Sequence, residues 1–477
     1  MLFNSFAFAL FLPIVLILYW LLPFRWQNRM LLIASYVFYG YWDWRFLFLI
    51  ALSTVVDYVA GLQVYKHEGH TNDKSVKLRK IWLVGSICSN LVILGFFKYF
   101  NFFIDTFAGL LGTLNVETNS LYLEIILPVG ISFYTFQTMS YTIDIYRKKM
   151  LPTRRFIDFA LYVAFFPQLV AGPIERACNL LPLILNKRTF NRTQFFEGVH
   201  LIFWGLFKKV YVADNLAPIV NRIFGMSDPT GMEAVIGTYA FAFQIYCDFS
   251  GYSDIARGVA KCMGFELMLN FNHPYVAISA SDFWRRWHIS LSTWLRDYLY
   301  VPLGGNRKGN FRTYVNLFLT MLLGGMWHGA SWIFILWGAY QGAFLLSHRL
   351  MKPLLNGISI IRMIPYSLRH LIKMVFVFQL VCIGWIIFRA QSVDQVVDML
   401  TAIFTWRGSA DYSLILPLLQ FAGPLMLFDL IQAAFGNDEL QKIEVIPIWI
   451  KSCVYAIIFY LLAFYGASAQ SFIYFQF

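Results

Sequence analysis

The chain has 477 residues, of which 59% are hydrophobic and only 13% are Asp, Glu, Lys or Arg. Soluble domains are typically about 45–50% apolar and about 25% charged, so these few charges could not cover a water-facing surface of this size. Aromatic residues make up 19% of the chain, which suits a bilayer because Trp and Tyr favour the headgroup region. The composition therefore excludes a soluble domain and predicts an integral membrane protein.

The net charge of +12 lies largely in short loops between apolar runs. This is the positive-inside pattern of a membrane protein, so we expect lipid around the chain and no nucleic acid as a partner. The pattern places the loops 64–80, 147–155 and 306–312 in the cytoplasm. No residue after Lys451 is charged, and we place the tail near the extracytoplasmic surface.

A spanning helix needs about 20 mostly apolar residues. Runs near that length lie at 5–24, 30–50, 46–64, 81–103, 121–144, 195–220, 232–252, 313–348 (divided into two segments), 370–389, 412–435 and 447–468. Two further stretches, 156–172 and 274–303, are broken by proline or charge and are expected to be re-entrant, interfacial or buried in the bundle. We therefore predict an all-α polytopic fold with roughly 11 spans. We expect one membrane domain, 1–477, in which 452–477 is an uncharged helix and tail.

Several kinds of chemistry have no support in the sequence. The six cysteines are scattered and form no CxxC pair, so neither a metal site nor a disulfide framework is predicted. The chain also lacks GxxxxGK[ST], GxSxG and HExxH, and no GxGxxG follows a predicted strand. Nucleotide hydrolysis, Rossmann cofactor binding and a nucleophile-elbow serine mechanism are therefore not indicated.

Ionisable residues inside apolar sequence are expensive in a membrane and mark candidate functional sites. His328 lies in LLGGMWHGASW, flanked by glycines that let another backbone or a ligand approach closely. An apolar surrounding keeps an imidazole neutral, and a neutral imidazole can act as a general base. A structural, hydrogen-bonded histidine is the alternative that these residues leave open.

His288 lies in SDFWRRWHISLSTWLRDYLYVPLGG, where the aromatic and apolar residues follow the 3–4 spacing of one helical face. This helix could be a simple amphipathic wall, or it could line a polar cavity. Asp248 and Asp254, in QIYCDFSGYSD, are expected to pair with Arg257 or with the arginines at 285–286. The basic loop GGNRKG, with Arg307 and Lys308, could contact the phosphates of an acyl carrier or be a plain loop.

Five long motifs resemble the membrane-bound O-acyltransferase superfamily, and within it the O-acetyltransferases of alginate and peptidoglycan. They are LPVGISFYTFQTMSYTIDIYR (127–147), FFPQLVAGPIERA (165–177), QIYCDFSGYSDIARG (244–258), DFWRRWHISLSTWLRDYLYVPLGGNRKG (282–309) and GGMWHGASWIFILWG (324–338). The resemblance runs nearly from end to end.

The resemblance implies a central tunnel with His328 at its middle as the catalytic residue and His288 as its assistant. It implies acetyl-CoA as the donor substrate, entering from the cytoplasm, and a bacterial inner membrane as the location. We assign the tunnel wall and substrate contacts to Trp284, Trp287, Trp327, Tyr298, Asp248 and Ser250. Arg307 and Lys308 are the candidates for contacting the donor.

The C-terminal residues Phe472-Ile473-Tyr474-Phe475 are similar to the ending of a small partner peptide of the D-alanylation system in the same superfamily. We therefore expect Tyr474 to accept the acetyl group and to pass it to an extracytoplasmic acyltransferase of the SGNH type, which modifies a cell-surface polysaccharide. An aromatic membrane anchor is the alternative interpretation of this tail. For the whole chain, the alternatives are a D-alanyl transferase and a transporter that performs no chemistry.

Overall fold

The computed structural model describes residues 1–69, 72–115, 123–357, 365–409, 412–435, 447–468 and 470–475. These residues form helices, turns and loops and contain no strand, as an all-α prediction requires. They fall into two compact units, one made of Met1–Leu201 and Ala256–Met268, the other of Ile202–Ile255 and Leu269–Phe477. The single membrane domain expected from the sequence stays a prediction.

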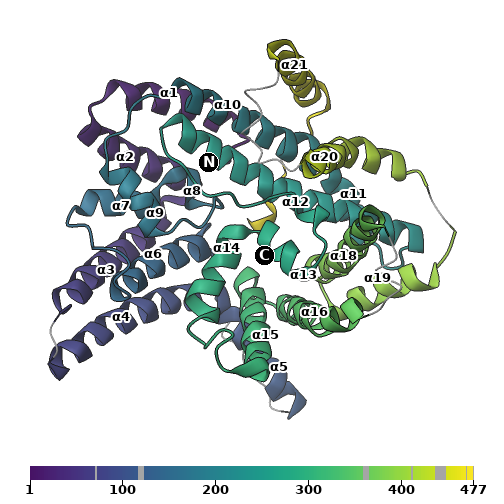
Figure 1. The fold of residues 1–477 in the computed structure, drawn as a ribbon, viewed down its shortest axis with the longest axis horizontal. Coiled ribbons are helices and arrows are strands. Elements are labelled where there is room, and N and C mark those ends of the chain that lie inside the picture. The colour runs from purple at the N-terminus through teal and green to yellow at the C-terminus, as the bar shows by residue number, and fades with distance from the viewer. Residues whose placement is uncertain are drawn as a thin grey trace. The chain divides into compact units, whose positions relative to one another are not determined.

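In the first unit, α2, α4 and α9 pack against α3, α6 and α7 (Figure 1). In chain order the helices of this unit are α1 (Phe6–Leu21), α2 (Phe24–Asp43), the 3-10 turn η1 (Trp44–Phe46), α3 (Leu47–Lys66), α4 (Asp73–Leu94), the π-helical η2 (Gly95–Tyr99), α5 (Phe100–Thr113), α6 (Ile131–Tyr146), α7 (Phe156–Ala164), α8 (Phe166–Leu169), α9 (Ala177–Leu185) and α10 (Arg192–Leu206).

Two sequence expectations are refined in this unit. The run 121–144 is not one helix, because residues 123–130 are loop and turn and α6 begins at Ile131. Gly130 adopts a φ of +77°, and a Cβ there would lie 2.5 Å from the carbonyl oxygen of Leu169, so only glycine fits this break. The broken stretch 156–172 forms the short helices α7 and α8, and residues 158–175 are all buried, which favours the buried alternative.

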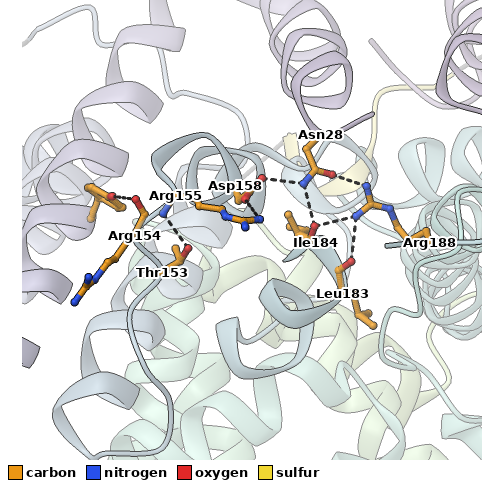
Figure 2. Close-up of polar contacts among 9 residues, drawn as sticks. Asn28, Thr153, Arg154, Arg155, Asp158, Leu183, Ile184 and Arg188 are labelled. Carbon is orange, nitrogen blue, oxygen red and sulfur yellow. Dashed lines mark hydrogen bonds and ion pairs between the residues drawn. The ribbon is translucent and has the colours of Figure 1, made fainter. Parts of the chain in front are cut away.

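A buried polar cluster ties three helices of this unit together (Figure 2). Asn28 of α2 donates to the Asp158 carboxylate of α7 at 2.8 Å and to the Ile184 carbonyl of α9 at 2.9 Å. Its own side-chain oxygen accepts from Arg188 at 2.5 Å, and Arg188 also donates to the Leu183 carbonyl at 3.1 Å. Arg188 thus supplies donors to carbonyls that the end of α9 leaves open.

The second unit begins in the last turn of α10 and contains the remaining helices. They are the π-helical η3 (Phe207–Ala213), α11 (Asp214–Phe224), the long α12 (Gly231–Cys262), η4 (Pro274–Val276), α13 (Ala280–Arg286), α14 (Ile289–Leu295), the π-helical η5 (Arg296–Tyr300), α15 (Gly309–His328), α16 (Trp332–Gly357), α18 (Tyr366–Arg389), α19 (Val393–Thr405), α20 (Ile415–Phe435), α21 (Ile448–Tyr465) and η6 (Ile473–Phe475). The last part of α12, from Ala256, belongs to the first unit.

Helices α15 and α16 lie side by side and form a close hairpin (Figure 1). A Cβ on Gly325 would lie 2.3 Å from the Phe334 carbonyl oxygen and 2.8 Å from the Cα of Gly338, so the two backbones touch where both residues are glycine. The turn between the helices, residues 329–331, divides the run 313–348 into the two segments that the sequence predicts. It also makes His328 the last residue of α15.

Among the described residues, five helical segments are long and apolar enough to cross a membrane. They are Phe24–Lys66, Asp73–Thr113, Tyr366–Arg389, Ile415–Ala433 and Ile448–Tyr465, and α1 is a shorter apolar helix. The first two segments each join successive helices through η1 or η2. A multi-pass membrane protein is therefore supported, and the count of about 11 spans stays a prediction.

Candidate active site

His328 lies at the centre of an aromatic cluster in the second unit. Its side chain is buried, and its imidazole ring lies 5.1 Å from the ring of Trp327, 5.0 Å from Trp337 and 5.5 Å from Phe388, centroid to centroid. The close turn after it depends on Gly329, where a Cβ would lie 2.1 Å from the ring of Phe334. The imidazole at the end of α15 is thus surrounded by aromatic rings.

His288 lies beside His328, but its backbone differs from the sequence expectation. The continuous helical face predicted through this region is wrong, because α13 ends at Arg286 and α14 starts at Ile289. His288 occupies the break with a φ of +42°, which is uncommon for a residue with a side chain. The break turns its ring inward, to 6.5 Å from the ring of His328.

Hydrogen bonds orient the His288 imidazole. Its Nδ1 lies 3.1 Å from the side-chain oxygen of Asn270, which also accepts from the Ser290 hydroxyl at 2.9 Å. Asn270 is itself fixed by donating to Ser253 at 3.1 Å. Since a side-chain oxygen only accepts, Nδ1 carries the proton and Nε2 keeps its lone pair. Burial lowers the pKa of His288 to about 3, so its ring is neutral at physiological pH.

The C-terminal tail enters the same cluster. The phenol ring of Tyr474, in η6, lies 5.7 Å from the His328 ring and 4.6 Å from the ring of Phe249 on α12. The preceding aromatic residue, Phe472, packs against Tyr252 of α12 at 5.0 Å. Burial raises the pKa of Tyr474 above its ordinary value. His328, His288, Trp327 and Tyr474 are therefore gathered in one place, while their roles stay predictions.

Of the other aromatic candidates, Trp284 and Trp287 pack on the outside of the cluster, and Tyr298 contacts another tryptophan. Trp284 lies 6.0 Å from Trp337, the residue that flanks His328, and the buried Trp287 lies 4.7 Å from Trp385. Tyr298, on η5, packs against Trp294 at 5.0 Å. Trp337, Trp385 and Phe388 were not singled out from the sequence, because tryptophan and phenylalanine are too common in this chain to stand out.

For Asp248 the expected arginine partners were wrong, and Asp254 has a lysine partner that the sequence did not suggest. Asp248 pairs with Lys209 at 2.8 Å, and Asp254 pairs with Lys208. Arg286, one of the expected partners, instead pairs with Asp282 at 3.0 Å. The signal that could have found these pairs is the dipeptide Lys208-Lys209 inside the apolar run 195–220, because buried cations require nearby carboxylates. Ser250 lies buried on the same helix, two residues after Asp248.

A pocket of about 710 Å³ opens near the histidine cluster, on the helix that precedes His288. Its lining includes Arg285 and Arg286 of α13 and His370 of α18. It also includes His273, whose Nδ1 lies 2.8 Å from the Asp429 carboxylate of α20. The lining also includes Asp282, the ion-pair partner of Arg286, so Arg285 is the group that suits an anionic ligand best.

Arg307 and Lys308, the candidates from the sequence, lie elsewhere, exposed in the turn before α15. Three glycines with positive φ, Gly304, Gly305 and Gly309, shape this loop, and Asn316 donates to the Gly305 carbonyl at 3.1 Å. The part of the chain that the structure describes contains no group of three or more His, Cys, Asp or Glu residues able to hold a metal ion. A continuous tunnel stays a prediction.

The model of the MBOAT, or membrane-bound O-acyltransferase, family matches residues 148–388, which contain both histidines and the pocket-lining arginines. The chain belongs to the membrane-bound O-acyltransferase family. It is 46% identical to the "Probable alginate O-acetylase AlgI" of Azotobacter vinelandii, over 84% of this chain and 77% of the relative. As a member of this family the chain is a multi-pass membrane acyltransferase.

The names of two further relatives of this O-acyltransferase also describe O-acetylation. The "Probable alginate O-acetylase AlgI" of Pseudomonas aeruginosa is 44% identical over 92% of this chain and 82% of the relative. The "Peptidoglycan O-acetyltransferase" of Helicobacter pylori is 34% identical over 86% of this chain and 80% of the relative. Both names describe transfer of acetyl groups to the hydroxyls of a polysaccharide.

Proposed function

We propose that the protein is a transmembrane O-acetyltransferase of the bacterial inner membrane that serves a cell-surface polysaccharide related to alginate or peptidoglycan. Acetyl-CoA on the cytoplasmic side is the donor, Tyr474 is the first acceptor, and an extracytoplasmic acyltransferase of the SGNH type receives the acetyl group next. The names of the relatives support the acetyl group and the polymer class. The observation that carries the proposal is the position of Tyr474, 5.7 Å from His328 between ring centroids.

The first step needs a base because a phenol is a weak nucleophile at neutral pH. An ordinary tyrosine has a pKa of about 10, and burial raises the pKa of Tyr474 further. A neutral His328 accepts the phenol proton while the phenol oxygen attacks the thioester carbonyl. The tetrahedral intermediate then expels the CoA sulfur, which takes the proton from His328. The products are free CoA and an acetyl ester on Tyr474.

His288 suits an assisting role. Its Nδ1–H donates to Asn270, and this hydrogen bond fixes the orientation of the ring and therefore the direction of the Nε2 lone pair. Because burial lowers its pKa to about 3, His288 remains a neutral acceptor throughout the physiological range. The ring lies 6.5 Å from that of His328. We assign to it the orientation of His328, and proton abstraction to His328.

The donor has two candidate docking places. The 710 Å³ pocket carries Arg285 and Arg286 within three residues of His288 in sequence, and the pantetheine arm of a donor held there by its phosphates would extend toward the histidines. Guanidinium groups bind phosphate through two parallel hydrogen bonds, which adds geometric specificity. The loop with Arg307 and Lys308 is basic but exposed. We therefore place the CoA phosphates in the pocket and assign the loop a contact at its entrance.

The second step releases the acetyl group outside the cell. An aryl ester is a more reactive acyl donor than an alkyl ester, because a phenolate leaves more readily than an alkoxide. Acetyl-Tyr474 therefore keeps enough reactivity to acylate a nucleophile of the SGNH partner, which then acetylates the polymer. In this arrangement the acetyl group crosses the membrane and the bulky CoA does not.

Two other functions make different predictions. A transporter that performs no chemistry needs no base, and a D-alanyl transferase would take its acyl group from a carrier protein. Purified protein is incubated with labelled acetyl-CoA, and covalent label is counted on wild type and on His328→Ala. We expect label on the wild type and a decrease of about 10²–10⁴-fold in the variant, the usual range for loss of a general base. Label that never attaches to the wild-type protein would contradict the acetyl relay.

A further inference from the structure

The C-terminal tail is held by a buried ion-pair network. Lys209 of η3 lies with its Nζ 2.8 Å from Asp214, 2.8 Å from Asp248 and 3.2 Å from the backbone carbonyl of Gln470, to which it donates. The second oxygen of Asp248 accepts the backbone N–H of Ile473 at 2.7 Å. The side chains of Lys209 and Asp248 are only 6% and 3% exposed.

We propose that Lys209 and Asp248 form a latch that holds the tail by its backbone and thereby positions Tyr474 beside His328. The two partners of the latch in the tail, the Gln470 carbonyl and the Ile473 N–H, belong to residues four and one before Tyr474. That the latch holds the tail follows from these contacts alone. That the held tail is the acyl acceptor rests on the proposed function.

The latch is suited to a tail that must be held firmly and then released. Hydrogen bonds to ionised groups are shorter and stronger than those between neutral groups, so two of them hold a short peptide firmly. When the tail leaves, Lys209 keeps both Asp214 and Asp248 as partners, and neither buried charge is left alone. The network can therefore exist with the tail bound or gone.

The helix before the tail gives it little other support. In α21 (Ile448–Tyr465) Ile458 is the one described residue whose side chain is buried, so this helix faces mostly outward. Its end is tied by Asn215, which donates to the Tyr465 carbonyl at 2.8 Å. Beyond that point the tail contacts that carry this inference are the latch and the packing of Phe472 and Tyr474 on Phe249, Tyr252 and His328.

The chain supplies a matched control for the latch. Lys208 and Asp254 form a second ion pair between η3 and α12, with side chains 3% and 5% exposed. Lys208 lies 5.7 Å from the ring of Trp204 and 6.0 Å from that of Tyr246. Asp254→Asn therefore removes the same charge from the same helix as Asp248→Asn, with an equally buried lysine left behind.

The test measures tail protection and acetyl loading separately in the full-length protein. Ile473→Pro removes the donated N–H without touching either charge, and proline is tolerated at the first residue of a short helix such as η6. In Asp248→Asn and Ile473→Pro we expect hydrogen exchange of the 465–475 segment to rise about tenfold, as local opening becomes easier. Asp254→Asn should leave it unchanged.

Loading is measured in the same variants as the single-turnover rate of Tyr474 acetylation. A misplaced acceptor should slow this rate about tenfold at saturating acetyl-CoA, while the KM for acetyl-CoA stays the same. Unchanged exchange in both Asp248→Asn and Ile473→Pro would overturn the latch. Raised exchange with an unchanged loading rate would overturn its positioning role. If wild-type Tyr474 is never acetylated, the proposed function fails, yet the exchange measurement still decides whether the latch holds the tail.

Discussion

The phenol ring of Tyr474 and the imidazole ring of His328 lie 5.7 Å apart, centroid to centroid, with their planes tilted by 40°. His328 is placed by the end of α15, and Tyr474 by a tail that follows α21. Two segments distant in sequence therefore bring a potential base and a potential nucleophile to one aromatic cluster. An aromatic anchor for the membrane would need no such position, so the anchor alternative explains less of the arrangement.

Replacing Tyr474 by phenylalanine tests the role of the hydroxyl group separately from the packing of the ring. Tyr474→Phe keeps the contact with Phe249 at 4.6 Å between ring centroids, so the tail should stay in place. We expect polymer O-acetylation in cells to fall to the level of a strain that lacks the protein. Acetyl content of the isolated polysaccharide measures this, with protein amount in the membrane as the control. Normal acetylation by the variant would exclude the tyrosine relay.

Basic residues of the pocket should govern donor affinity. Arg285→Ala is expected to raise the KM for acetyl-CoA about tenfold or more, because a charge-assisted hydrogen bond contributes about 1.5–3 kcal/mol. The turnover rate at saturation should change little. The matched comparison is Arg307→Ala, in the exposed loop before α15. A larger KM effect from Arg307→Ala than from Arg285→Ala would move the donor phosphates to the loop.

Ionisation of His288 should not contribute to the pH dependence of activity. Burial lowers its pKa to about 3, below its ordinary value of 6.5, so the ring is already neutral at pH 5. The contribution of the neutral His288 ring to the stability of the fold is complete above pH 6.5 and is lost as the pH falls toward 3. His288→Gln should lower the turnover rate but leave any acid limb between pH 5 and 8 in place. Disappearance of that limb in the variant would contradict this assignment.

Ionisation of Glu175 should make the first unit less stable as the pH rises toward 8. Its side chain is buried in the loop after α8, and burial raises its pKa from 4.5 to about 7. Since the folded state holds this proton more tightly than the unfolded state, the contribution of Glu175 to stability is complete below pH 4.5 and is lost as the pH rises to 7. Glu175→Gln mimics the neutral form, so at pH 8 it should be more stable than wild type, by up to about 3 kcal/mol.

Thermal unfolding of wild type and Glu175→Gln in detergent, at pH 5 and at pH 8, measures this difference. The Gln variant should gain stability relative to wild type at pH 8 and little at pH 5. An equal difference at both pH values would mean that the substitution acts through packing and not through the proton.

The glycine after the catalytic candidate should be indispensable. A Cβ on Gly329 would lie 2.1 Å from the ring of Phe334, which packs against Phe388 at 5.1 Å, a direct neighbour of His328. Gly329→Ala is expected to reduce the loading rate about 10²-fold by misplacing the imidazole. Gly423 of α20 has open space around it, so Gly423→Ala is the control and should retain activity. Full activity of Gly329→Ala would mean that this packing does not position His328.

The sequence predicted those features of the site that depend on residues close together in the chain. His328 stands out because glycines and aromatics surround a single ionisable residue, and the turn after it divides two apolar runs. The all-helical architecture follows from the apolar runs themselves. The roles of the histidines and of Tyr474 came from the family resemblance, which no periodicity could have supplied.

The features that the sequence did not predict depend on contacts between distant segments. The pairing of Lys209 with Asp248 links η3 to α12, and local spacing suggested arginines instead. The break at His288 has no proline or glycine to mark it, and its aromatic spacing fits an unbroken helix. The pocket joins α13, α18 and α20, so its basic lining becomes visible only when these helices are brought together.

The central claim is that Tyr474 carries the acetyl group. The most direct measurement is mass spectrometry of the C-terminal peptide, released from purified protein after brief incubation with acetyl-CoA and quenched in acid. The account predicts an acetyl group on Tyr474 in the wild type and none in His328→Ala. A wild-type protein that turns over acetyl-CoA while its Tyr474 remains unmodified throughout would contradict it.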